Sequence, residues 1–163
     1  MIIDSEVSLG VIESIMLDVD EQHRTRYLKP VVMSIVQNVA SEVLILQSVH
    51  DRTWTYPYGE IRENEPILEA LTRQLEDNTT IAPDNVRVVN YCGSDVLRAH
   101  GVKFYYFNVF IRQTYLFKPK ASDYSDHRWV AKSEVRYAMP DKSDMKQRSM
   151  LKALSGLMSG RTS

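Results

Sequence analysis

The chain has 163 residues, enough for one domain with a buried core that needs no disulfide bonds. Hydrophobic residues make up 44% of the sequence and charged residues 25%, values typical of a globular soluble protein. The 20 basic and 21 acidic residues give a net charge of −1, which excludes a general electrostatic attraction to nucleic acid or membranes. The single cysteine, Cys92, excludes an internal disulfide and a cysteine-rich zinc site.

The start of the chain predicts an extension in front of the main domain. No apolar run is long enough for a transmembrane helix, and the acidic N-terminal stretch lacks the pattern of a secretory signal or a transit peptide. Residues 1–29 are therefore expected to be an N-terminal extension, helical over 5–19 and a polar connector over 18–26. Residues 30–158 are expected to form the main domain, and residues 159–163 a flexible tail.

Two short apolar runs, 31–38 and 42–49, are rich in β-branched residues and predict buried strands joined as a hairpin. The aromatic stretch 50–60 that follows is expected to be a loop, since it contains proline and glycine. From Pro66, placed at the first helical position, the spacing predicts a helix that ends near residues 78–79. Its apolar stripe consists of Ile67, Leu68, Leu71 and Leu75.

The second half of the chain predicts further strands and a final helix. Strands are expected over 85–93 and 102–117, and after a polar loop a short strand over 127–135 leads into a helix capped by Ser133. The apolar spacing over 142–158 predicts the last helix. Strands and helices that alternate in this order within one domain predict an α/β or α+β fold with a mixed sheet.

The stretch "WTYPYGEIRENEPILEALTRQLEDNTTI", residues 54–81, resembles the signature motif of the Nudix family. The positions that match this Nudix box at the proper spacing are Gly59, Glu65, Arg73, Leu75 and Ile81. The resemblance implies a Nudix-like α/β/α sandwich with a mixed β-sheet. It also implies that Glu65 and Arg73 pair between the loop and the helix.

The departures from the box fall at the positions where the family has metal-binding carboxylates. The box has Gln74, Asp77 and Asn78 where the family has glutamates, and Thr80 where it has a glycine. Hard divalent cations require several anionic oxygens at once. We therefore expect a vestigial box with no catalytic residue, no cofactor and no metal, with Asp77 as the one ligand if any metal binds.

Three further segments extend the resemblance: "WTYPYGE", "YCGSDVLRAHGVKFYYF" and "WVAKSE" are similar to the Nudix-like family numbered forty-six of the mitochondrial large ribosomal subunit. This implies a non-catalytic structural protein in the mitochondrial matrix that binds other ribosomal proteins and rRNA, with no membrane and no small-molecule substrate. Candidate contacts to RNA or a partner are the basic residues Lys118, Lys120, Arg148 and Lys152.

Two alternatives stay open. The first is a divergent Nudix pyrophosphohydrolase for nucleoside diphosphate derivatives, which uses Mg²⁺ held by Glu60, Glu76, Asp77 or a distant carboxylate. It predicts an open pocket beneath Tyr56 and Tyr58. The second is a subunit of an RNA-processing complex that binds RNA without cleaving it. For these alternatives the compartment would be the cytoplasm or the nucleus.

Overall fold

The computed structural model describes residues 1–114 and 117–158. Within this part of the chain, strands join into one mixed sheet in the order β1-β6-β7-β2-β3-β4, with β5 paired to β2 and β8 paired to β3. The strands are β1 (Ile2–Ile3), β2 (Lys29–Gln37), β3 (Glu42–Ser48), β4 (Trp54–Thr55), β5 (Tyr58–Glu60), β6 (Val86–Leu97), β7 (Val102–Ile111) and β8 (Tyr124–Ala131). The helices are α1 (Leu9–Thr25), α2 (Ile67–Thr79), α3 (Val135–Ala138) and α4 (Met145–Met158), with short 3-10 turns at 83–85, 98–100 and 132–134.

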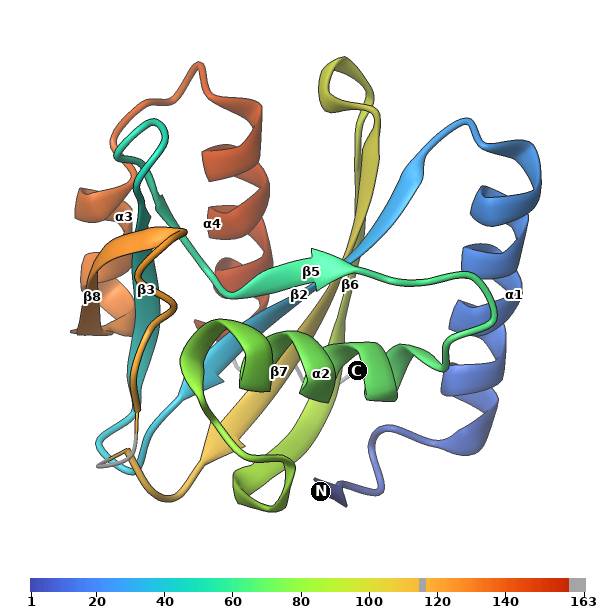
Figure 1. The fold of residues 1–163 in the computed structure, drawn as a ribbon, viewed down its shortest axis with the longest axis horizontal. Helices are drawn as coiled ribbons and strands as arrows, with labels where there is room; N and C mark the ends of the chain where they lie inside the picture. Colours follow the sequence, from blue (N-terminus) through green and yellow to red (C-terminus); the bar gives the residue numbers. More distant parts are fainter. Residues whose placement is uncertain (115–116, 159–163) are drawn as a thin grey trace.

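The sheet is mixed because β7 pairs in parallel with β2 but antiparallel with β6, while β2 and β3 form the expected antiparallel hairpin. In Figure 1 the strands cross behind α2, the β6–β7 hairpin projects at the top, and α1 and α4 stand on either side. One apolar cluster joins α1 and α2 to the sheet, and a second joins α3 and α4 to it through different strand residues. Because successive strand residues face opposite sides, β2 contributes Val32 and Val36 to the first cluster and Met33 and Ile35 to the second. The α/β/α sandwich is thus confirmed.

Several predicted boundaries are wrong. Helix α1 extends to Thr25 through the residues expected to be a polar connector, because its polar face docks on the domain. His23 Nε2 hydrogen-bonds to the Ile61 carbonyl at 2.9 Å, and Asp18 accepts from Lys103 Nζ at 2.6 Å and from Tyr105 Oη at 2.5 Å. These contacts join the first 29 residues to the sheet and to the loop before α2.

Other differences lie around the candidate motif. The stretch 50–60 contains the short strands β4 and β5, and Pro66 is the N-cap of α2 with extended backbone, not its first helical residue. Strand β8 begins inside the expected polar loop, and α3 has Glu134 at its N-cap position instead of Ser133. The predicted end of the strand over 102–117 includes residues 115–116, which with the tail 159–163 lie outside the described residues.

Candidate functional site

Strand β5 and helix α2 approach each other closely at Gly59. A Cβ atom added to Gly59 would lie 2.7 Å from Cβ of Gln74, well inside any normal contact. The glycine is therefore required by the close packing of strand against helix. Its role is to bring the loop between β5 and α2 to a fixed position over the helix.

A charged clamp then holds this loop. Arg73 donates from Nε to Glu65 Oε2 at 2.8 Å and from Nη2 to Glu65 Oε1 at 2.9 Å, so the expected pairing is present and bidentate. The same Nη2 donates to the Glu60 carbonyl at 2.7 Å. The hydrogen bonds from Arg73 lower the pKa of the Glu65 carboxyl, in opposition to its partial burial. Gly59, Glu65 and Arg73 are called the box clamp below.

The metal-ligand positions of the box have other structural roles. Gln74 is buried and donates from Nε2 to the Ser34 hydroxyl at 3.0 Å, which attaches α2 to the central strand β2. Asn78 donates from Nδ2 to the Tyr58 carbonyl at 3.1 Å. Asp77 is exposed to solvent. Gln74 and Asn78 are neutral amides that donate hydrogen bonds to neighbouring groups, and of the three residues Asp77 alone carries a charge. These residues therefore form no cluster of anionic oxygens.

Asn78 also lines a cavity of about 310 Å³ at the C-terminal end of α2. We call it the polar cavity; its lining residues are Ser48, His50, Asp51, Thr53, Thr55, Tyr58, Asn78, Asp123, Tyr124 and Lys146. The pocket expected beneath Tyr56 and Tyr58 is thus present at Tyr58 but not at Tyr56. The Tyr56 side chain is fully buried, and its hydroxyl donates to the Met150 carbonyl. The lining residues come from the loops after β3 and before β8, from the adjoining ends of strands, from the last turn of α2 and from the first turn of α4.

Backbone hydrogen bonds bring these loops together. The amide of Val49 donates to the carbonyl of Asp123 at 2.9 Å, which joins the loop after β3 to the loop before β8. The amide of Lys120 donates to the carbonyl of Asn78 at 2.8 Å, which joins the second of these loops to the end of α2. Asp51 and Asp123 therefore lie on adjoining loops beside the last turn of the box helix, although 72 positions separate them in the sequence.

The electrostatics of the cavity depend on Asp51, Asp123 and Lys146. Thr53 donates to Asp51 Oδ1 from its hydroxyl at 2.7 Å and from its amide at 3.0 Å, and these hydrogen bonds lower the pKa of the Asp51 carboxyl. Burial lowers the pKa of Lys146, while the charges of Asp51 and Asp144 oppose that shift. Burial also raises the pKa of the Tyr58 hydroxyl, with smaller contributions from Asp51 and Asp123. The cavity thus holds two carboxylates and one ammonium group.

A divalent cation can be tested against these donors. No group of three or more His, Cys, Asp or Glu side chains with metal-binding geometry occurs in residues 1–114 and 117–158, so the described protein has no complete metal cage. Mg²⁺, however, is usually held by one or two carboxylates together with the substrate's phosphates. Asp51 and Asp123 fit that second arrangement, and the box residues Gln74 and Asn78 do not.

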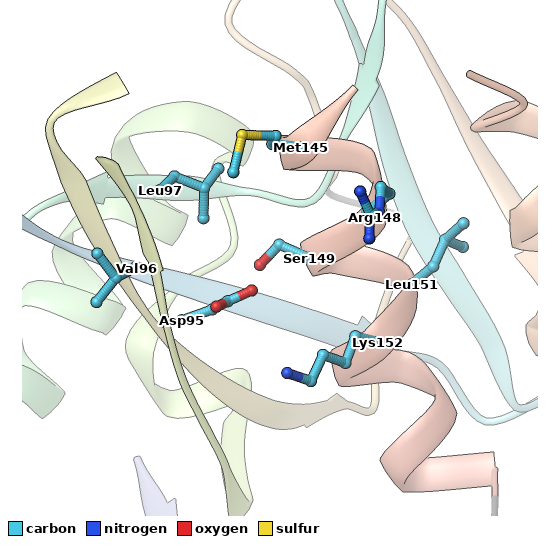
Figure 2. Close-up of a pocket in the computed structure, with 8 residues that line it drawn as sticks. All are labelled: Asp95, Val96, Leu97, Met145, Arg148, Ser149, Leu151 and Lys152. Atoms are coloured by element: carbon cyan, nitrogen blue, oxygen red, sulfur yellow. The ribbon is translucent and has the colours of Figure 1, made fainter. Parts of the chain in front are cut away.

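The four basic residues chosen from the sequence lie in two places. Lys118 and Lys120 lie in the loop before β8, where their amides donate to the carbonyls of Thr79 and Asn78 at the end of α2. Lys120 Nζ lies 3.4 Å from Asp123 Oδ2 at the edge of the polar cavity. Arg148 and Lys152 line a separate groove of about 580 Å³ between α4 and the β6–β7 hairpin. Figure 2 shows Asp95 and Lys152 at one end of this basic groove and Leu97 and Met145 at the other. Their predicted contacts with RNA or a partner stay predictions.

Sequence reasoning missed Asp51 and Asp123 and did not connect Lys146 with them. They stand at no recognisable spacing, because the pairing of β8 with β3 and the position of α4 bring them together. The one local signal is Asp51-x-Thr53, a pattern typical of an Asx turn, which holds the aspartate at the loop tip. In the described part of the chain no helix is both long and apolar enough to cross a membrane.

Comparisons with known proteins concern the family and the fold of the chain. The family model of the NUDIX domain matches residues 27–154. An RNA pyrophosphohydrolase of Alkalilimnicola ehrlichii is 34% identical over 61 residues, which are 37% of this chain and 34% of that protein. The chain therefore spans about a third of that relative's length.

Solved structures share the fold at low identity. The Ap4A hydrolase of C. elegans superposes with a TM-score of 0.66 at 14% identity, over 82% of this chain and 98% of the other. The MutT protein of Methanosarcina mazei gives 0.63 at 12% identity over 83% and 96%. The E. coli dihydroneopterin triphosphate pyrophosphohydrolase gives 0.63 at 14% identity over 82% and 99%.

These findings contradict three sequence-based predictions: that the chain is a non-catalytic structural component of the ribosome, that it is not an enzyme, and that it requires no cofactor. The main reading rests on the glutamates missing from the box, whereas Asp51 and Asp123 reach the cavity from loops outside it, as the alternative with a distant carboxylate allows. The predicted protein and RNA partners and the mitochondrial compartment stay predictions. Because the family model matches residues 27–154 and the fold is the same as that of solved Nudix structures, the chain belongs to the Nudix family.

Proposed function

We propose that the protein is a Nudix hydrolase that cleaves a phosphoanhydride bond in a nucleoside diphosphate derivative. The observation that carries the proposal is the polar cavity, which lies at the end of the box helix and combines the carboxylates of Asp51 and Asp123 with the ammonium group of Lys146. The family match and the relative named RNA pyrophosphohydrolase support it.

The cavity suits hydrolysis of a charged linkage. Water attacks a phosphorus atom of the anhydride, the bond from that phosphorus to the bridging oxygen breaks, and a carboxylate within reach accepts the proton of the attacking water. Asp51 and Asp123 are the candidates for that proton transfer and for holding Mg²⁺ with the substrate's phosphates. The bound cation would neutralise phosphate charge and polarise the phosphoryl oxygen.

Residues around the cavity have distinct parts in the proposed reaction. The box clamp fixes the start of α2, and Gln74 attaches the middle of that helix to β2, so that Asn78 is presented at the cavity wall. Thr53 orients Asp51, and Lys146 supplies positive charge. These contacts fix the box helix and the side chain of Asp51 in position, as precise orientation of a substrate requires.

The test is a substrate panel. The purified full chain is incubated with Mg²⁺ or Mn²⁺ and a dinucleoside polyphosphate, a nucleoside triphosphate or a 5′-triphosphorylated RNA, and the products are separated by ion-exchange chromatography. We expect cleavage of at least one phosphoanhydride, with release of pyrophosphate or a nucleotide, and its loss on addition of EDTA. If no member of the panel is cleaved with either metal, the proposal is wrong.

A further inference from the structure

The polar cavity contains the cation Lys146, which lacks an ion-pair partner among the described residues. Lys146 is the second residue of α4 and is partly buried, and of the described residues that line the cavity it is the one Lys or Arg. Its ammonium nitrogen lies 4.3 Å from the centroid of the Tyr58 ring. No carboxylate among the described residues forms an ion pair with it, although six other such pairs are present there.

A cation that is partly removed from water needs compensation. A charge taken out of water costs free energy unless it is paired, and the face of an aromatic ring supplies part of the missing attraction. Asp51 and Asp144 act on Lys146 electrostatically, but neither is close enough to form an ion pair. The ammonium group therefore retains capacity for an anion that enters the cavity.

The charges of the surrounding loops define which anion fits. Asp51 and Asp123 line the same cavity and would repel a bare anion, whereas Lys120 lies 3.4 Å from Asp123 and offsets part of that charge. An anion accompanied by a divalent cation satisfies both signs, because the cation faces the carboxylates and the anion faces the ammonium group. A diphosphate with its bound Mg²⁺ has this character.

We propose that Lys146, contributed by the last helix and not by the Nudix box, binds a phosphate group of the substrate directly in the polar cavity, with the Tyr58 ring holding its ammonium group in place. The inference rests on the proposed function and names a phosphate-binding residue for it. It assigns α4 a part in substrate binding, although the box match ends at Ile81, just after α2.

The test measures binding without turnover. Calorimetry with inorganic pyrophosphate and Mg²⁺ gives the Kd of the full-length wild type, of Lys146→Gln and Lys146→Arg, and of Lys142→Gln as the matched control. Lys142 precedes α4, is exposed and lies outside the lining of the cavity. We expect Kd to rise at least tenfold in Lys146→Gln, to rise less in Lys146→Arg, and to change less than twofold in Lys142→Gln.

Thermal melting of each variant separates lost binding from lost folding, and Lys146→Arg keeps the positive charge if Lys146→Gln fails to fold. An unchanged Kd in a folded Lys146→Gln protein, or no pyrophosphate binding by the wild type, overturns the proposal. The outcome can be separated from that of the substrate panel. If the protein hydrolyses a substrate but Lys146→Gln leaves the Kd for pyrophosphate unchanged, only this inference is wrong. Lys146-dependent binding without any hydrolysis removes the proposed function and leaves the phosphate site.

Discussion

The box clamp and the polar cavity both include residues of α2, but the clamp residues are close together in the sequence and the charged cavity residues are far apart. Gly59, Glu65 and Arg73 are contributed by one continuous stretch of 15 residues, and their contacts fix the backbone of the loop and the helix. Asp51, Asp123 and Lys146 come from three separate segments that only the tertiary fold assembles. The comparison teaches that a motif can keep its architectural residues while the charged groups beside it are supplied from elsewhere.

The largest effect on stability is expected at Gly59. In Gly59→Ala the new methyl group would lie 2.7 Å from Cβ of Gln74, so β5 and α2 must separate or Gln74 must shift. Overpacking of this kind costs about 2 kcal/mol, and urea unfolding followed by circular dichroism measures it.

Gly10→Ala is the matched control for Gly59→Ala. Gly10 lies in α1, and the nearest atom to its added Cβ would be Ser8 Oγ at 3.9 Å, an ordinary contact. Because alanine favours helix, this variant is expected to be as stable as the wild type or more stable. Equal stability of Gly59→Ala and wild type would show that the clamp does not depend on close packing.

The next effect concerns the charged part of the clamp. Arg73→Gln removes the bidentate pair with Glu65 and the hydrogen bond to the Glu60 carbonyl. The side chains of Arg73 and Glu65 are 25% and 13% exposed, so solvent reduces the loss to about 1 kcal/mol. Arg24→Gln, which removes an exposed pair within α1, is the control and should change the unfolding free energy by less than half as much.

A smaller effect follows from the lowered pKa of Glu65. A carboxyl whose pKa is lower in the folded protein contributes stability above its unfolded value, close to 4.5, and loses it as the pH falls through the folded value. The difference in unfolding free energy between wild type and Glu65→Gln should therefore be largest near neutral pH and shrink below about pH 4.5. Denaturation midpoints at a series of pH values measure it, and a difference independent of pH would show that the charge of Glu65 is immaterial.

The sequence predicts the features of this protein that depend on residues close together in the chain. The β2–β3 hairpin, the apolar stripe of α2 and the Glu65–Arg73 pair follow from local spacing, since each depends on residues close together in the chain. Helix α1 was predicted to end too early because the polar side chains of Asp18 and His23 dock on distant groups. The acidic lining of the cavity could not be predicted, because Asp51 and Asp123 share neither a strand nor a helix.

Gln74 shows the limit of reading one motif in isolation. An amide at this ligand position predicts loss of metal binding when the box is considered alone, and the structure places that amide in a buried hydrogen bond to Ser34. Gln74 lies on the box helix, whereas Asp51 and Asp123 lie on the loops after β3 and before β8, so the residue type at position 74 gives no information on them.

If carboxylates outside the box carry the reaction, their removal must lower the rate of hydrolysis far more than removal of the box carboxylate Asp77 does. The value of kcat/KM is determined with Mg²⁺ for the wild type, Asp51→Asn, Asp123→Asn and Asp77→Asn on the best substrate of the panel. We expect a loss of about 100-fold or more in kcat/KM for Asp51→Asn or Asp123→Asn and a change of less than about threefold for Asp77→Asn, because Asp77 does not line the cavity. A large loss in Asp77→Asn alone, with both cavity variants fully active, would show that the box carboxylate carries the reaction instead.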